Sequence, residues 1–242
     1  MKTAIVTGAS RGIGNAIALR LAAEGVRVVL CARDQQLLDD TAKVIGEERS
    51  LVVASDLRLP DSPAKAVDAA IAKFGSLDIV VNNAGATKRG EFETLTDDDF
   101  IDGFALKYYA AVRFTRAAWP HLKKQSGSIV NIVGAGGRTP GALFTIGGSV
   151  NAAILSFTKA MSEKGIQDGV QVNAINPGPV RTARLAKQLE SSSEPEFLRA
   201  SKISRIGEPG DIAALVSFIL SPHGRYMQGS LVDFDGGQTK TI

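Results

Sequence analysis

Short apolar runs alternate with longer amphipathic segments along the whole chain. The apolar runs predict strands at residues 3–6, 26–31, 51–55, 78–82, 128–133, 170–175 and 230–234. Apolar residues recur at helical spacing between them, which predicts helices at residues 15–24, 35–45, 63–74, 100–124 and 149–164. Strands and helices are therefore expected to alternate from one end of the chain to the other.

This alternation predicts an α/β fold in which helices cross over between parallel strands. Runs such as VRVVLC are continuously apolar, as expected of strands covered on both sides. We expect a Rossmann-like doubly wound parallel sheet of about seven strands with helices on both faces, in a single domain over residues 1–242. Residues 182–204 contain SSSEPE and are the least regular stretch, so we expect a mobile substrate loop or lid there.

Composition agrees with a folded protein and excludes several classes. The 242 residues are 44% hydrophobic and 22% charged, which argues against disorder. The net charge of +3 comes without a Lys/Arg stripe, so we expect no nucleic-acid partner. Residues 212–220 form the longest strongly apolar stretch, too short for a bilayer, and the opening MKTAIVTG is too short for a secretory signal. We expect a cytoplasmic protein with no membrane partner.

The chain offers few metal ligands. Cys31 is its single cysteine and cannot form an internal disulfide, and the histidines are His121 and His223 alone. No cluster has the spacing of a metal site. We expect no metal.

The most informative motif is TGASRGIG, residues 7–14, between the first predicted strand and helix. Gly8, Gly12 and Gly14 allow a sharp turn that points backbone N–H groups and the positive end of the helix at one anion. A dinucleotide pyrophosphate fits this arrangement.

Further candidates follow other predicted strands: Arg33, Asp56 with Leu57, residues 82–85 and residues 177–180. The carboxyl ends of parallel strands meet at one edge of a sheet, where ligands bind. The sequence therefore predicts a nucleotide site at this edge.

The order TGxxxGxG, NNAG, NxxNPGPVxT and DFDGG resembles the short-chain dehydrogenase/reductase family over essentially the whole chain. The resemblance implies that the glycine turn lines the diphosphate and adenosine ribose, Asp56 and Leu57 flank the adenine, and Pro177, Gly178, Val180 and Thr182 hold the nicotinamide carboxamide. The implied cofactor-binding residues are Gly8, Ser10, Arg11, Gly12, Ile13, Gly14, Arg33, Asp56, Leu57, Asn83, Ala84, Gly85, Asn151, Pro177, Gly178, Val180 and Thr182.

Two features favour NADP(H) over NAD(H). An acidic residue ending the second strand would grip the ribose 2′-hydroxyl of NAD, but Ala32 stands there. Arg33 and Arg11 would instead face a 2′-phosphate, which guanidinium groups bind well.

The family's reaction residues are a Tyr, a Lys four positions later, a Ser at a strand end and an Asn on an earlier helix. Counting from neighbouring motifs places Gly147, Asn151, Gly134 and Lys107 at these positions. In enoyl reductases the Tyr precedes the Lys by seven positions. The residue seven positions before Asn151 is Phe144, which has no hydroxyl. The resemblance thus implies a divergent member without the usual catalytic residues.

Lys107 stands at the family's Asn position, and Asn151 stands at its Lys position. The site therefore keeps one ammonium and one amide with their positions exchanged. We take Lys107 as the candidate acid, because burial lowers a lysine pKa, and Asn151 as a partner of the nicotinamide ribose. The alternative is that Lys107 reaches solvent or pairs with Asp102. The glycine-rich segment 134–148 either makes space for a larger substrate or is conformationally loose. Arg138 in this segment is a candidate anchor for an anionic substrate.

Three functions stay open. The first is an atypical NADP(H)-dependent oxidoreductase that acts on a small-molecule carbonyl or activated alkene. The second is a non-catalytic NADP(H)-binding protein with a sensor or assembly role. A cofactor-free lyase or dehalogenase is disfavoured, since the glycine turn and arginines are intact. Residues 205–237 resemble the region that packs family members into tetramers, so we expect a homotetramer, with a dimer as the alternative.

Overall fold

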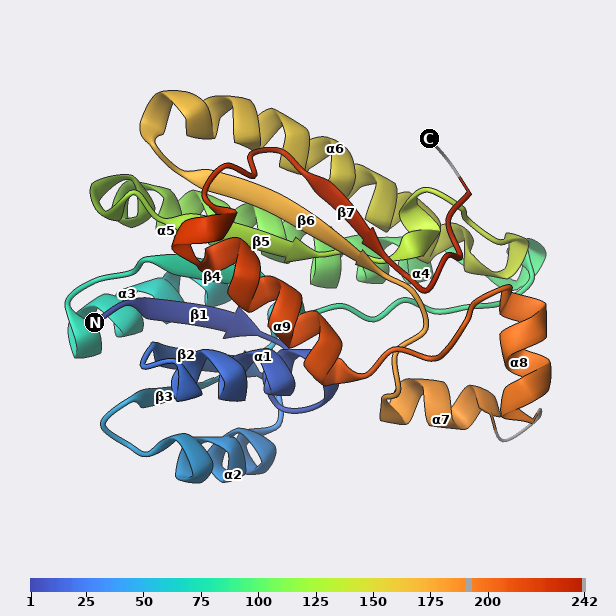
Figure 1. Ribbon diagram of the computed structural model, residues 1–242, viewed down its shortest axis with the longest axis horizontal. Helices are drawn as coiled ribbons and strands as arrows, with labels where there is room; N and C mark the ends of the chain where they lie inside the picture. Colours follow the sequence, from blue (N-terminus) through green and yellow to red (C-terminus); the bar gives the residue numbers. More distant parts are fainter. Residues whose placement is uncertain (190–192, 241–242) are drawn as a thin grey trace.

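A parallel sheet runs through the computed structural model, which describes residues 1–189 and 193–240. Its order is β3-β2-β1-β4-β5-β6-β7 (Figure 1). The chain therefore builds outward from β1 in one direction and then in the other, which confirms the predicted doubly wound sheet. The strands are β1 Thr3–Thr7, β2 Arg27–Ala32, β3 Ser50–Ala54, β4 Ile79–Asn82, β5 Ser128–Ile132, β6 Gln171–Pro177 and β7 Leu231–Phe234.

Helices cover both faces of the sheet. Helices α1, α2 and α9 pack on one face, and α3, α5 and α6 pack on the other (Figure 1). The central strands β1, β4, β5 and β6 are buried throughout, which is why their sequences are continuously apolar or carry internally bonded polar groups. The helices are α1 Gly12–Ala23, α2 Gln35–Ile45, α3 Ser62–Phe74, α4 Asp97–Gly103, α5 Ala110–Gln125, α6 Thr145–Asp168, α7 Ala183–Leu189, α8 Glu194–Ser201 and α9 Pro209–Leu220.

The helix predicted over residues 100–124 has a wider turn within it. Helix α4 begins after Thr96, whose hydroxyl accepts from the Asp99 N–H in a capping box. A π-helical stretch, Phe104–Tyr109, then joins α4 to α5. Such π turns are often found at functional sites, and this one carries Lys107.

The segment 182–204 is more regular than the sequence predicts. It contains α7 and α8, which lie beyond the carboxyl ends of the strands (Figure 1). Arg181, just before α7, pairs with Glu194 at 3.0 Å and with Glu208 at 2.9 Å, so it ties both helices to the start of α9. The segment is therefore helical over much of its length, since capping and ion pairs compensate for its polar composition, and the expected substrate lid stays a prediction. Residues 190–192 lie outside the described residues.

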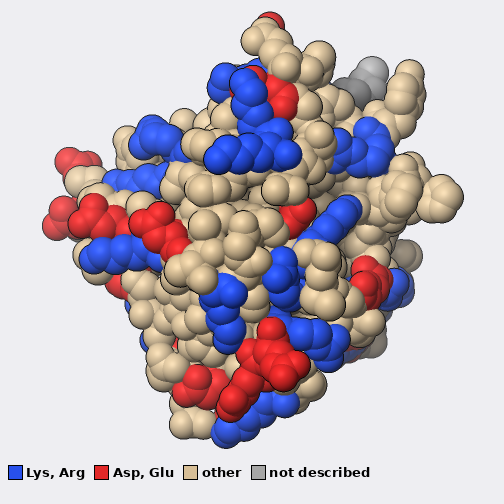
Figure 2. All heavy atoms as spheres, turned by 90° about the vertical axis from the view of Figure 1, so that its left-hand side faces the viewer, with Lys and Arg blue, Asp and Glu red and all other residues tan. Residues whose placement is uncertain are grey.

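The opposite end of the molecule, at the amino ends of the strands, has a mixed surface. Figure 2 shows this face, with acidic and basic side chains interspersed over it. None of the described helices is both long and apolar enough to span a bilayer.

Candidate active site

The glycine turn between β1 and α1 has the conformation that its sequence predicts. Gly8 and Gly12 have φ angles of +69° and +59°, which side chains disfavour. A Cβ at Gly14 would collide with the carbonyl oxygen of Gly8, so this glycine allows α1 to approach the turn. No side chain caps the start of α1, and its first turn has no acidic residue. Its N–H groups are therefore available to an anion.

The end of β4 is fastened to this turn by Thr7 and Asn83. The Thr7 hydroxyl accepts from the N–H groups of Asn83 and Ala84 at 2.8 and 2.9 Å. The Asn83 amide nitrogen donates to the Thr7 carbonyl at 2.8 Å. These bonds hold the NNAG segment beside the glycine turn, at the point where the strand order reverses.

A cleft of about 1390 Å³ opens along this edge of the sheet. It brings together most of the residues that the sequence analysis assigns to the cofactor, together with both candidate catalytic residues. The assigned residues in its wall are Gly8, Ser10, Arg11, Gly12, Ile13, Arg33, Leu57, Asn83, Ala84, Gly85, Lys107, Asn151, Pro177, Gly178, Val180 and Thr182.

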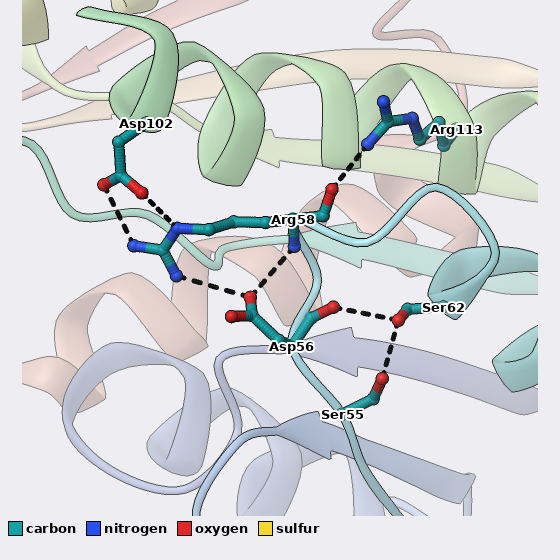
Figure 3. A network of polar contacts seen from close by, with 6 residues as sticks. All are labelled: Ser55, Asp56, Arg58, Ser62, Asp102 and Arg113. Carbon is teal, nitrogen blue, oxygen red and sulfur yellow. Dashed lines mark hydrogen bonds and ion pairs between the residues drawn. The ribbon is translucent and has the colours of Figure 1, made fainter. Parts of the chain in front are cut away.

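Two assigned residues, Gly14 and Asp56, are not in the cleft wall. Gly14 packs against the turn, as described above. The Asp56 carboxylate accepts from Arg58, and Arg58 also donates to both carboxylate oxygens of Asp102 (Figure 3). Asp56 thus connects the segment after β3 to α4, and its neighbours Ser55 and Leu57 line the cleft instead.

The outer end of the cleft is basic. Arg11, Ala32 and Arg33 line it, next to Asp34. The Asp34 carboxylate caps α2 by accepting from the Leu37 N–H at 3.2 Å. Asp34 is the single carboxylate among the described lining residues. This end is suited to a phosphate group.

At the inner end, Lys107 and Asn151 are in direct contact. The Lys107 ammonium donates to Asn151 Oδ1 at 2.6 Å and also to the Val133 carbonyl. Its aliphatic stem packs on Gly85, where any Cβ would lie 2.7 Å from Lys107 Cδ. Asp102 pairs with Arg58, and among the described residues it forms no ion pair with Lys107.

The surroundings of Lys107 change its acidity. Burial, together with the nearby charge of Arg184, lowers the pKa of Lys107 to about 7. An ammonium with this pKa exchanges its proton readily at neutral pH, as general acids and bases do.

Glycines and one aromatic ring surround the Lys107–Asn151 pair. Gly134 has φ +133°, and a Cβ there would lie 3.0 Å from the Asn151 amide nitrogen. A Cβ at Gly147 would lie within the ring of Phe144, which also covers Gly136. Phe144 therefore fills the space that a side chain at position 147 would need. This segment is packed, which argues against the interpretation that it is loose.

One sequence candidate belongs elsewhere. Arg138 pairs with Asp233 at 3.2 Å and donates to the Leu231 carbonyl on β7, and it does not line the cleft. Three arginines that the sequence analysis missed do line it, Arg89, Arg184 and Arg181, the last of which is paired with Glu194 and Glu208. For Arg89 and Arg184 the available signals were their positions shortly after NNAG and two residues after Thr182.

A parallel sheet with a glycine turn before its first helix, and with a cleft at its switch point, defines the Rossmann-like class of nucleotide-binding folds. Residues 8–239 match the family described as enoyl-(acyl carrier protein) reductase. The chain belongs to the short-chain dehydrogenase/reductase family of oxidoreductases.

Among its relatives is an uncharacterized oxidoreductase of Mycobacterium tuberculosis (strain CDC 1551 / Oshkosh), 36% identical, with 98% of this chain and 92% of that protein covered. L-Sorbose reductase from Gluconobacter frateurii, solved with NADPH and L-sorbose, has a TM-score of 0.92 and 31% identity over 100% of this chain and 97% of that one. A short-chain oxidoreductase from Pseudomonas aeruginosa PAO1, solved with NADPH and described as containing an atypical catalytic center, has a TM-score of 0.93 and 25% identity over 100% of this chain and 98% of that one.

Proposed function

We propose that this protein is an NADP(H)-dependent oxidoreductase that transfers a hydride between the nicotinamide and a small-molecule carbonyl or activated C=C bond. The observation that carries the proposal is the Lys107–Asn151 contact in the cleft. Lys107 is the proton-carrying group, since its lowered pKa, about 7, lets it hold or release a proton at neutral pH.

The cleft fits NADP(H) on its own geometry. The uncapped start of α1 suits the pyrophosphate, and Arg11 and Arg33 suit a 2′-phosphate. Two solved relatives hold NADPH. Calorimetry is expected to give a lower Kd for NADPH than for NADH, and Arg33→Gln is expected to weaken NADPH binding alone.

The bound cofactor supplies the hydride, and the protein supplies position and a proton. Pro177, Gly178, Val180 and Thr182 form the wall expected to hold the nicotinamide carboxamide. Asn151, whose Oδ1 accepts from Lys107, keeps its amide N–H₂ group for the nicotinamide ribose. Lys107 then donates to the substrate oxygen or carbon that receives negative charge. Helix α7 contributes Arg184 and Leu185 to the cleft, and we assign it the role of covering the substrate.

The proposed site departs from the usual members of the family. Gly134, Gly147 and Asn151 stand where Ser, Tyr and Lys are usual, and none of the described cleft residues is a tyrosine. The ring of Phe144 over Gly147 leaves no space for a phenol. This observation favours a second candidate function, a non-catalytic NADP(H)-binding protein.

The pH dependence of kcat/KM tests the role of Lys107. In the reduction direction the protonated ammonium is the active form, so kcat/KM should be constant below about pH 7 and fall above it. Lys107→Met keeps the stem that packs on Gly85 and should lower kcat/KM by about 10²–10⁴-fold and remove this break. Lys88→Gln is the control, because Lys88 pairs with Asp99 at 2.8 Å, away from the cleft.

An unchanged pH profile in Lys107→Met would show that another group carries the proton. Single-turnover oxidation of bound NADPH against a panel of carbonyls and enones separates the two candidate functions. A protein that binds NADPH tightly and oxidises it with no member of the panel is the non-catalytic candidate.

A further inference from the structure

Three cationic side chains surround the inner part of the cleft without a carboxylate to balance them. They are Lys107, Arg89 and Arg184. Among the described residues no carboxylate forms an ion pair with any of the three, whereas the neighbouring cations Lys88 and Arg181 are paired. The outer end of the cleft, with Arg11 and Arg33, is basic as well, whereas the far face of the molecule has interspersed charges (Figure 2).

Direct contacts hold Arg89 at the mouth of the inner site. Its guanidinium lies over the Phe144 ring, 4.0 Å from the ring centroid. A backbone hydrogen bond from Gly90 to the Leu143 carbonyl, 3.2 Å, joins the two segments. The Phe144 ring also packs on Gly136, and Gly136 is next to the Asn151 amide. A stacked guanidinium keeps its N–H edges available for a ligand.

Arg184 comes from another element, α7. Its Nη2 donates to the Gly85 carbonyl at 2.7 Å, and Gly85 is the residue on which the stem of Lys107 packs. Arg89 therefore packs on Phe144, and Phe144 packs on Gly136, which is next to Asn151. Asn151 accepts from Lys107, and the stem of Lys107 packs on Gly85, whose carbonyl accepts from Arg184. Arg184 lies close to both other cations, because its charge lowers the pKa of Lys107 and that of Arg89.

Holding these cations together has an electrostatic cost. Desolvation and the charge of Arg184 lower the pKa of Arg89, and desolvation and the charge of Arg11 lower that of Arg184. In the proposed function the phosphates of NADP(H) bind at the start of α1 and at Arg11 and Arg33, and none of them is assigned to Lys107, Arg89 or Arg184. An anion between Arg89 and Arg184 would relieve the repulsion.

We propose that the substrate carries an oxyanion, a carboxylate or a phosphate ester, which Arg89 and Arg184 bind while its carbonyl or C=C bond faces Lys107. The inference rests on the proposed function and names the substrate class of the same site. Guanidinium forks match both kinds of oxyanion through paired hydrogen bonds. The role first assigned to Arg138 belongs to these two arginines.

Calorimetry on NADP⁺-saturated protein tests the proposal with matched probes. The pairs are acetoacetate with methyl acetoacetate, pyruvate with methyl pyruvate, and dihydroxyacetone phosphate with dihydroxyacetone. At least one anion should bind more tightly than its uncharged counterpart. Arg89→Gln and Arg184→Gln should each raise the Kd of that anion by about 10-fold to 100-fold, which is the effect of losing one charged hydrogen-bond donor. The Kd of the uncharged counterpart should not change.

The control is Lys88→Gln, which removes the same charge from the same segment outside the cleft and should leave the anion affinity unchanged. The proposal is wrong if no anion binds more tightly than its uncharged counterpart, or if the double variant Arg89→Gln/Arg184→Gln binds the anion normally. The proposal is also wrong if these variants raise the Kd of NADPH by the same factor as the Kd of the anion, because the arginines would then bind the cofactor. Failure of the proposed function looks different: NADPH and the anion bind, and NADPH is never oxidised.

Discussion

Phe144 and Gly147 are a complementary pair, one residue supplying the volume that the other lacks. The Phe144 ring lies between Arg89 on one side and the backbone of Gly136 and Gly147 on the other. Gly147 is in the first turn of α6, and glycine in a helix costs up to about 1 kcal/mol relative to alanine. At position 147 this cost is offset by the packing of the ring, so the loss of a side chain there has a steric reason.

Gly147→Ala should therefore destabilise the protein by about 1–3 kcal/mol, as overpacking does, although alanine favours helices. Gly210→Ala is the matched control, since Gly210 is also helical and a Cβ there meets nothing within 4 Å. Urea unfolding should show a lower midpoint for the first variant and an equal or higher one for the second. Phe144→Ala should restore space, so that Phe144→Ala/Gly147→Ala costs less than the sum of the single changes. Additive losses would contradict this pairing.

At the scale of elements, the two long helices α5 and α6 are joined at their ends by one carboxylate. Asp168, the last residue of α6, accepts from the Trp119 indole at 2.8 Å and from Lys123 at 2.7 Å, both on α5. Lys164, one turn earlier, pairs with it at 3.0 Å. Lys107 lies in the π-helical stretch that leads directly into α5, and Asn151 is near the start of α6, so the relative position of the two helices sets the site.

These donors, Lys123 first, lower the pKa of Asp168 below its ordinary value. Because the folded-state pKa is below the unfolded one, the stabilisation is complete above the unfolded pKa of about 4 and is lost as the pH falls below it. Asp168→Asn should thus lower the thermal midpoint at pH 7, and the difference from the wild type should shrink below about pH 4. Asp40→Asn, which breaks an exposed pair with Lys43, should have little effect at either pH. Equal losses at pH 7 and pH 3 would contradict the argument.

At the scale of the whole molecule, the last elements of the chain carry three exposed aromatic residues. Strand β7 is at the edge of the sheet, and Phe234 at its end, Phe218 on α9 and Tyr226 between them are exposed. Unpaired strand edges and exposed aromatic residues favour association. We propose that copies of the chain assemble through this region into a homotetramer, with a dimer as the alternative.

Light scattering at micromolar concentration should show a tetramer or dimer, and Phe218→Asp should shift it to smaller species because a charge would be buried in the contact. Val44→Asp is the control, since Val44 is exposed on α2. Helix α2 joins β2 to β3, at the opposite edge of the sheet from β7. A monomeric wild type, or a Phe218→Asp variant with unchanged mass, would refute the proposed surface.

The sequence by itself determined the sheet, the crossover helices α1, α2, α3, α5 and α6, and the nucleotide turn, because strand and helix periodicity and the φ > 0 positions of Gly8 and Gly12 are local properties. It also placed Lys107 and Asn151 among the site residues, but only through a resemblance and a count of positions. It did not predict α7, α8 and α9.

Tertiary structure alone decided which side chains meet. Lys107 and Asn151 are 44 positions apart, and their contact depends on the packing of α5 and α6 and on the π turn that carries Lys107. It also removed Arg138 from the site and placed Arg89 and Arg184 in it. Such contacts depend on how loops from different strands pack at one edge of the sheet, and no short stretch of sequence records that packing.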